Sequence, residues 1–256
     1  MPVSSKGARH GDPVVGAAAR TVASGSSRLF SAWSQGSPVP DVMDRRCEGV
    51  ADFSTRRARV SQVPLGTALL ASEFAGEHQG DDEDSVLQML SEPREVIYDG
   101  ANAYLRVGAN WTGFFLGDPA GPRVVNDPLW PLDALFGARP GVEIGGEAVR
   151  GVAATRYRLT LDLAAADAAL SAGVTVPALP YRVLTHMPAE VWLDAAGLAR
   201  RIAVVTEPTA RDDQSLVWSI VELWDFGVAA DIQPPSPDAV LRPRDAFRLG
   251  PAGPAA

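Results

Sequence analysis

The stretch GVAATRYRLTLDL, residues 151–163, carries the clearest periodic pattern in the chain. Alanine, aromatic and leucine side chains alternate along it with arginine, threonine and aspartate. A period of two is typical of a β-strand that has one apolar face and one solvated face. The sequence therefore predicts a sheet whose apolar side, which includes Tyr157, Leu159 and Leu161, is covered by another layer.

The segment before this strand, DPLWPLDALFGA at 127–138, has the pattern of a covering helix. It begins with Asp127 as the expected N-cap and Pro128 as the expected first helical residue. Leucine and phenylalanine then recur at helical spacing on one side, whereas Trp130 falls off that side. We expect this helix to lie over the apolar face of the sheet, with Trp130 at the rim of any opening.

Two other segments also have helical patterns. Residues 164–172 are rich in alanine and precede Gly173, a residue type that often ends helices. Near the N-terminus, Asp12 is the expected N-cap of a short amphipathic helix at 13–23. The chain is thus expected to contain three helices, inserted between strands and not alternating with them.

The remaining regular segments are typical of strands joined in hairpins. An Asp-Gly pair divides EVIYDGANAYLRV, and such pairs are strong hairpin signals. In LVWSIVELWDFG, apolar residues occupy both parities, so this strand is expected to be covered on both faces. The predicted strand segments are 28–34, 47–63, 95–107, 189–208 and 216–227.

Together these elements predict an α+β fold built on one large curved antiparallel sheet, an incomplete barrel with helices over its concave face. The length of 256 residues suits a single domain of this kind. We expect a flexible leader at 1–11, the domain at 12–240 and a proline-rich, disordered tail at 241–256.

Composition excludes several classes of function. The net charge of -8 disfavours a nucleic-acid partner, because phosphate binding needs a concentrated basic surface. A single cysteine, Cys47, allows no internal disulfide and no thiolate metal cluster. No segment approaches the roughly 20 apolar residues of a membrane-spanning helix, so any membrane contact is expected to be peripheral. No signal peptide or lipidation motif is visible in the chain as written.

Catalytic signatures are absent from the sequence. It has no nucleophile elbow, no phosphate-binding glycine loop and no dinucleotide fingerprint. His10, His78 and His186 are expected in solvent-exposed segments, and Cys47 is interpreted as a small apolar side chain. The acidic stretch at 75–84 lacks the spacing and turn glycine of a calcium loop. The predictions are therefore no enzyme, no catalytic residue, no metal and no cofactor.

Several segments resemble the LppX/LprG type of actinobacterial lipoproteins, which have a LolA-like fold. They are the hairpins at 95–107 and 189–205, the strand-to-helix passage at 156–170 and the Pro-Pro-x-x-Asp ending at 234–238. The resemblance spans about residues 13–240. It implies a curved sheet that holds acyl chains or glycolipids beneath its helices, and a place in the cell envelope. Because no export signal is visible, a cytoplasmic location is the alternative.

Two functions remain open from the sequence. The first is non-enzymatic binding or carriage of a lipid, acyl chain or glycolipid between sheet and helices, with peripheral membrane contact possible. The second is a protein-interaction or sensory module whose core is filled and whose protein partner is unknown. For the first, the expected hydrophobic lining is Leu129, Trp130, Leu132, Leu135, Phe136, Tyr157, Leu159 and Leu161.

Overall fold

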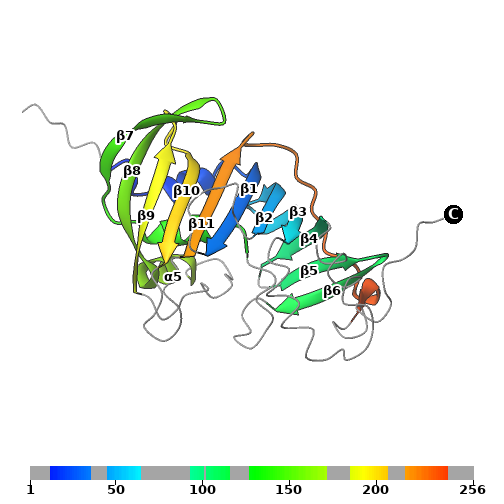
Figure 1. The fold of residues 1–256 in the computed structure, drawn as a ribbon. Coiled ribbons are helices and arrows are strands. Elements are labelled where there is room, and N and C mark those ends of the chain that lie inside the picture. Colours follow the sequence, from blue (N-terminus) through cyan, green and yellow to red (C-terminus); the bar gives the residue numbers. More distant parts are fainter. Residues whose placement is uncertain are drawn as a thin grey trace, which may run out of the picture.

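A computed structural model shows that the described residues of the chain form a single sheet of twelve strands (Figure 1). The strand order is β12-β6-β5-β4-β3-β2-β1-β11-β10-β9-β8-β7, and β12 and β7 end the sheet without pairing with each other. All neighbouring strands are antiparallel except β12 and β6, which pair in parallel. The described residues are 12–35, 45–64, 93–100, 102–115, 127–171, 185–206 and 217–241.

The expected fold class is confirmed: a large, mostly antiparallel sheet, not closed, that carries short helices. The helices are α1 (Ala17–Val22), α4 (Trp130–Ala134), α5 (Leu163–Ser171) and the 3-10 helices η2 (Leu135–Gly137) and η3 (Pro237–Ala239). The strands are β1 (Ser26–Gln35), β2 (Arg45–Asp52), β3 (Arg57–Pro64), β4 (Arg94–Asp99), β5 (Asn102–Val107), β6 (Asn110–Phe115), β7 (Val142–Val149), β8 (Val152–Asp162), β9 (His186–Leu193), β10 (Ala199–Thr206), β11 (Val217–Trp224) and β12 (Val240–Leu241).

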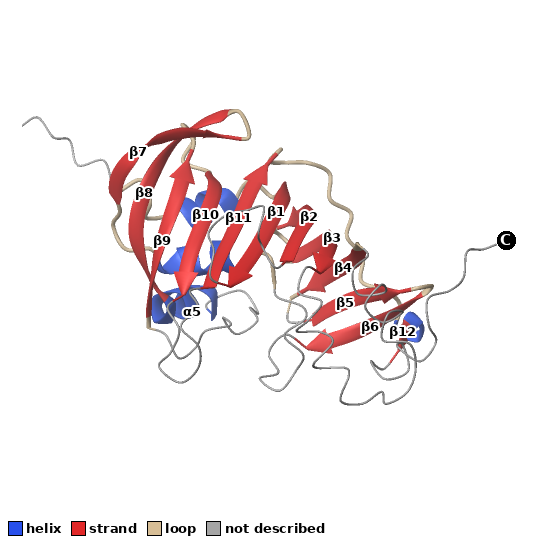
Figure 2. Cartoon of the chain, viewed as in Figure 1, coloured by secondary structure: helices blue, strands red, loops and turns tan. Residues whose placement is uncertain are grey.

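Three helical segments lie over one face of the sheet. α4 packs on β10 and β11, α1 packs on β10, and α5 packs on β8. Figure 2 shows these helices behind strands β9–β11. We call this side of the sheet the helix face and the opposite side the outer face.

The alternation that predicted β8 is visible in the packing. Leu159 and Leu161 are buried in the main core on the helix face, together with Val191 of β9. Arg156 and Arg158 instead point to the outer face, where both contact Glu190. Because cross-strand partners share a face, the same parity extends along the register from β8 to β1.

Strand β11 is covered on both faces, as its two apolar parities predicted. Val221 and Leu223 are buried in the main core on the helix face. On the outer face Trp224 is stacked by the guanidinium of Arg150, whose carbon lies 3.6 Å from the ring centroid. Arg150 belongs to the turn between β7 and β8 and therefore reaches across several strands to make this contact.

The helix boundaries differ from those expected at the N-terminus. α1 starts at Ala17, not at residue 13, and its N-cap is Gly16, which has a φ of 85°. Asp12 is not the N-cap. Its carboxylate accepts hydrogen bonds from the backbone N–H groups of Val14 (2.8 Å) and Gly141 (3.1 Å), so it fastens the entry to α1 to the start of β7.

Strand β7 was missed by the sequence prediction, because Gly145 and Gly146 break its apolar pattern. A β-bulge between Glu143 and Gly145 shifts the register with β8, and most of the strand is exposed. At the other end of the sheet, β12 pairs with β6 and ends the described chain. The predicted Gly173 helix end and the acidic stretch at 75–84 lie outside the described residues.

Candidate ligand site

The segment α4–η2, residues 130–137, forms a lid on the helix face. It is shorter than the expected helix at 127–138. The Asp127 side chain accepts a hydrogen bond from the backbone N–H of Leu129 at 2.8 Å, but the N-cap position is Leu129 itself. The predicted Asp127 cap was therefore wrong in position, although Asp127 stabilises the turn that leads into the helix.

Arg56 fixes this lid to the sheet. It lies in the β2–β3 turn, with a φ of 57°, and its guanidinium binds Asp127 at 3.0 Å and also Asp133. Asp133, in the middle of α4, is only 3% exposed. A buried carboxylate is costly unless it is paired, so the ion pair with Arg56 lets α4 lie flat on the sheet.

Sequence reasoning missed Arg56 because its partners lie 71 and 77 residues away along the chain. One signal was present in the sequence: Asp133 interrupts an otherwise apolar segment. A charge in that position calls for a buried partner of opposite sign.

The residues expected to line a ligand site belong to one continuous hydrophobic cluster. Phe136 and Tyr157 are only partly buried, and both pack against that cluster. Trp130 is 6% exposed, so it lies within the core and not at an open rim. The buried members of the expected set are Leu129, Trp130, Leu132, Leu135, Leu159 and Leu161.

The lid packs tightly where it meets β8. Ala138 forms an isolated bridge with Leu161, and a Cβ added at Gly137 would lie 1.9 Å from the carbonyl oxygen of Asp162. Only glycine permits this approach. The C-terminal end of the lid is therefore held directly against the end of β8 and the start of α5.

Beyond the lid, the helix face of β1–β3 carries several small residues beside the buried Leu29 and Val60. Ser27 pairs with Ala51, and Ala51 pairs with Ala58, so these three small side chains form a row across three strands. All three are fully buried. In the next row a Cβ on Gly49 would lie 2.0 Å from the carbonyl oxygen of Arg59. We call Ser27, Gly49, Ala51 and Ala58 the small-residue floor.

Polar atoms without partners occur on the same face. The Ser27 and Thr112 hydroxyl oxygens and the Trp33 indole nitrogen are buried, and none of them has a hydrogen-bond partner among the described residues. Tyr98, by contrast, donates its hydroxyl to Gln62 at 3.3 Å. Buried polar atoms are usually paired, so these three are groups that a bound molecule could satisfy.

Two titratable groups with shifted pKa values, Tyr157 and Asp162, lie near the lid. Burial raises the pKa of Tyr157, and the nearby Glu143 carboxylate raises it further, so the phenol stays neutral. At the start of α5, the pKa of Asp162 is lowered by the backbone N–H of Ala165 and then by Arg139, whose guanidinium lies 3.0 Å away. The Nε2 atom of the exposed His186 lies 3.8 Å from Oδ2 of Asp162.

Other candidate groups give no catalytic arrangement within the described part of the chain. His186 contacts Arg139 at 2.6 Å and Thr185 at 3.1 Å. Cys47 is buried in the main core, as expected of a small apolar side chain. The described residues contain no cluster of three or more metal-ligating side chains, and none of their helices is long and apolar enough to cross a membrane. His10 and His78 lie outside the described residues.

The comparisons with known proteins give a match at the level of structure only. No protein-family model and no curated protein matches the sequence. The lipoprotein LppX of Mycobacterium tuberculosis has a similar structure, with a TM-score of 0.50 over 87% of this chain and 100% of that one, at 10% identity. The chain has the LppX-like fold.

Two further structures are more distant. LprF from Mycobacterium bovis matches with a TM-score of 0.46 at 13% identity, over 86% of this chain and 95% of that one. The MucA/MucB complex of Pseudomonas aeruginosa matches with a TM-score of 0.34 at 13% identity, over 89% of this chain and 60% of that one. The resemblance inferred from the sequence hairpins is thus confirmed as a likeness of fold to LppX.

Proposed function

We propose that the protein binds or carries an apolar ligand, such as a lipid, acyl chain or glycolipid, between the helix face of the sheet and its covering helices. The observation that carries this proposal is the contrast along one LppX-like face. Large side chains fill the face beneath the lid, whereas the adjoining floor consists of Ser27, Gly49, Ala51 and Ala58. We propose that the ligand lies beside the row of Ser27, Ala51 and Ala58, whereas Gly49 permits the close approach of the Arg59 carbonyl of β3.

Burial alone supplies enough energy for such a ligand. Each buried methylene contributes roughly 0.8 kcal/mol, so a chain of about a dozen carbons contributes on the order of 10 kcal/mol before the costs of association. The lid provides the apolar contacts through Leu129, Leu132, Leu135 and Trp130, with Phe136 at its half-buried end. On the sheet, Tyr157, Leu159 and Leu161 complete this lining.

The proposal includes non-enzymatic action in the cell envelope. Its support is that the lipoprotein LppX of Mycobacterium tuberculosis has a similar arrangement of sheet and helices. An apolar cargo would reach the site from a membrane surface, so the proposed membrane contact is peripheral. A protein-interaction module with a filled core is the alternative, and a cytoplasmic location would fit it equally well.

Native mass spectrometry of the purified full chain, before and after extraction with organic solvent, tests the proposal. We expect a mass increment that extraction removes, and saturable binding of a fluorescent fatty acid to the extracted protein. If no lipid co-purifies and the fatty acid does not bind, the ligand proposal is wrong and the filled-core alternative stands.

Variants in the lid connect binding to the proposed site. The double change Leu132→Asp and Phe136→Asp should abolish fatty-acid binding, because it places charges against the apolar chain. Leu132 is fully buried, so Phe136→Asp alone, at a half-buried position, is the variant that is expected to keep the fold. Circular dichroism checks the fold. Unchanged binding by a folded Phe136→Asp protein would remove this part of the lid from the site.

A further inference from the structure

The end of the β7–β8 hairpin extends beyond the sheet. The last pair between β8 and β9 joins Thr155 to Leu193, so residues 152–154 pair only with residues 147–149 of β7. Arg150 and Gly151, with φ angles of 48° and 80°, form the two-residue turn at the tip. Positive φ at both turn positions is characteristic of a type I′ hairpin. We call residues 147–154 the strap.

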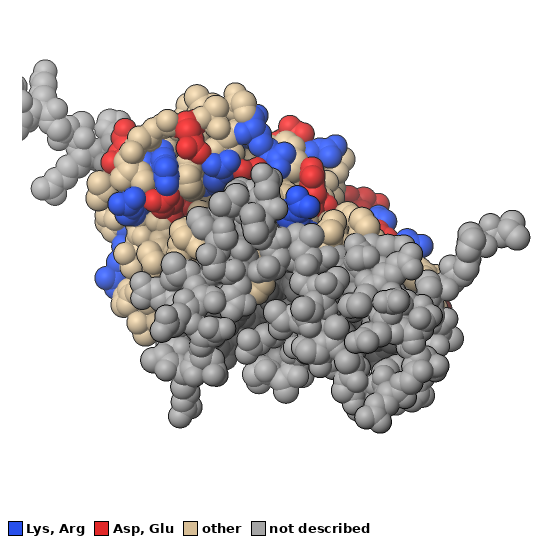
Figure 3. Space-filling view, in the orientation of Figure 1, with Lys and Arg blue, Asp and Glu red and all other residues tan. Residues whose placement is uncertain are grey.

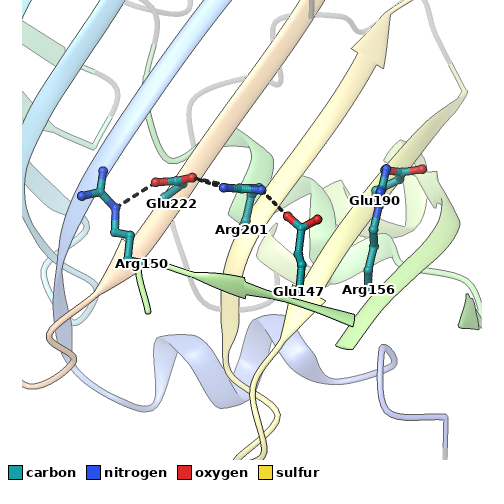
Figure 4. A network of polar contacts seen from close by, with 6 residues as sticks. All are labelled: Glu147, Arg150, Arg156, Glu190, Arg201 and Glu222. Carbon is teal, nitrogen blue, oxygen red and sulfur yellow. Dashed lines mark hydrogen bonds and ion pairs between the residues drawn. The ribbon is translucent and has the colours of Figure 1, made fainter. Parts of the chain in front are cut away.

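The strap folds over the outer face and is tied to strands two and three positions beyond β8 (Figure 4). Arg150 Nε donates to Glu222 Oε2 of β11 at 2.8 Å. Arg201 of β10 binds the same Glu222 and also Glu147 of the strap, each at 2.7 Å. These contacts form one chain of alternating charges, Arg150–Glu222–Arg201–Glu147.

Apolar and aromatic contacts accompany the ion pairs. Val149, at the end of the strap, is buried against Trp192 and Ala154 in a small cluster separate from the main core. The guanidinium of Arg150 also covers the ring of Trp224. A left-handed backbone strains an arginine, whereas asparagine adopts it readily, so the contacts of Arg150 must offset that strain.

Gly145 and Gly146 of β7 directly precede the strap. Gly145 has a φ of 143°, which other residues rarely adopt, and a Cβ added there would meet nothing within 4 Å. Position 145 therefore requires glycine because of its backbone conformation, not because of close packing. The β-bulge at the same place disrupts the ladder with β8. A bend in this position would let residues 147–149 move away from the outer face together with residues 152–154, which pair with no other strand, while the β8–β9 pairs from Thr155 onward stay in place.

The tied strands are those that support the lid. Glu222 lies between Val221 and Leu223, which face α4 from β11, and Arg201 precedes Ile202 on β10. We propose that the strap is a detachable clamp on the outer face, which holds β10 and β11 in the position that α4 requires and loosens the lid when it opens. Opening would admit or release the ligand beneath the lid, a role that rests on the proposed function.

The ties of the strap differ in exposure. The Glu147 side chain is 42% exposed, so salt screens its ion pair and that pair contributes little, whereas the Glu222 side chain is only 12% exposed and is the main anchor. A two-stranded ribbon is only marginally stable by itself. Figure 3, drawn from the outer face, shows the positive and negative side chains interspersed over this region.

Hydrogen–deuterium exchange on the full chain tests the clamp. Glu222→Gln removes the carboxylate shared by Arg150 and Arg201, and we expect amide exchange in residues 127–137 to rise by about threefold to tenfold. Glu190→Gln is the matched control, since it removes an outer-face carboxylate whose partners, Arg156 and Arg158, lie on β8 outside the strap. That control should leave lid exchange at the wild-type rate.

A second variant separates the clamp from the folding of the hairpin. Arg150→Asn creates an Asn-Gly turn, the favoured type I′ sequence, so the strap itself should stay ordered while its ties to Glu222 and Trp224 are lost. Lid exchange should again rise. If Glu222→Gln and Arg150→Asn both leave lid exchange at the level of Glu190→Gln, the clamp proposal is wrong. The readout needs no ligand, so failure of lipid binding would overturn the proposed function and not this inference.

Discussion

The helix face of the sheet has two parts that differ in their side chains. Beneath α4 and α5, strands β8–β11 present large residues such as Leu161, Met187 and Ile202, all fully buried. On β1–β3 the same face presents the small-residue floor, which includes the unpartnered hydroxyl of Ser27. One continuous sheet therefore carries a region in which large buried residues predominate and a region that includes a row of three small ones. Under the proposed function, stability should depend mainly on the first region, and ligand binding on the floor together with the lid.

The largest effect is expected where the two parts are joined, at Arg56. Arg56→Ala should destabilise the protein by about 3–5 kcal/mol, because it leaves the Asp133 carboxylate buried and unpaired. Urea unfolding followed by circular dichroism measures this loss. Arg59→Ala, which removes an arginine paired with Glu95 at the surface, is the control and should cost no more than about 1 kcal/mol. Equal losses would show that Arg56 is not the lock between lid and sheet.

Replacing one alanine by leucine in each part of the helix face tests whether that part has space for a ligand or is a filled core. Ala189→Leu, on the helix face of β9, should cost about 1–3 kcal/mol, because it overpacks the region of large side chains. Ala58→Leu, in the floor, should leave the free energy of unfolding of the extracted protein nearly unchanged, because the new side chain enters the ligand space.

Fatty-acid binding should respond in the opposite order. Ala58→Leu should weaken binding strongly, whereas Ala189→Leu, beside the lining residue Leu159, should weaken it less in the folded fraction. If Ala58→Leu destabilises the protein as much as Ala189→Leu does and binding is unaffected, the floor is part of an ordinary core. The comparison between the two parts would then fail, and with it the proposed location of the ligand.

The sequence predicted the first part better than the second, for a physical reason. The period of two in residues 151–163 depends only on local geometry, so it correctly gave the faces of Leu159, Leu161 and Arg156. The hairpins and the two-sided cover of β11 followed from similar local patterns. Burial of large apolar residues leaves a clear trace in a single sequence.

Features that depend on distant contacts left little trace. Strand β7 was hidden by Gly145 and Gly146, and the Arg56–Asp133 pair joins residues 77 positions apart. The small-residue floor requires knowledge that Ser27, Ala51 and Ala58 are register neighbours, which only the sheet order provides. Small residues in separate strands have no common signal along the chain.

A smaller effect is expected at the hydroxyl of the floor. Ser27→Ala should stabilise the ligand-free protein by up to about 1 kcal/mol, because the Ser27 oxygen is buried without a partner. Ser26→Ala is the adjacent control: its hydroxyl donates to the carbonyl of Val228, so its loss should destabilise by about 0.5–1.5 kcal/mol. Opposite signs in thermal unfolding would support the comparison. A loss of stability in both variants would mean that Ser27 is satisfied in solution.

The smallest effect concerns the pH dependence of the filled part, where Asp162 joins β8 to α5. The backbone N–H of Ala165, followed by Arg139, lowers the pKa of Asp162 from 3.8. A carboxyl group with a lowered folded-state pKa stabilises the protein above its unfolded pKa, and this contribution is lost as the pH falls towards the folded value. Asp162→Asn should therefore be less stable than wild type at pH 6, and the difference should shrink between about pH 4 and pH 3. Urea titrations across this range measure it. A difference that stays constant with pH would mean that the Asp162 charge does not hold the start of α5.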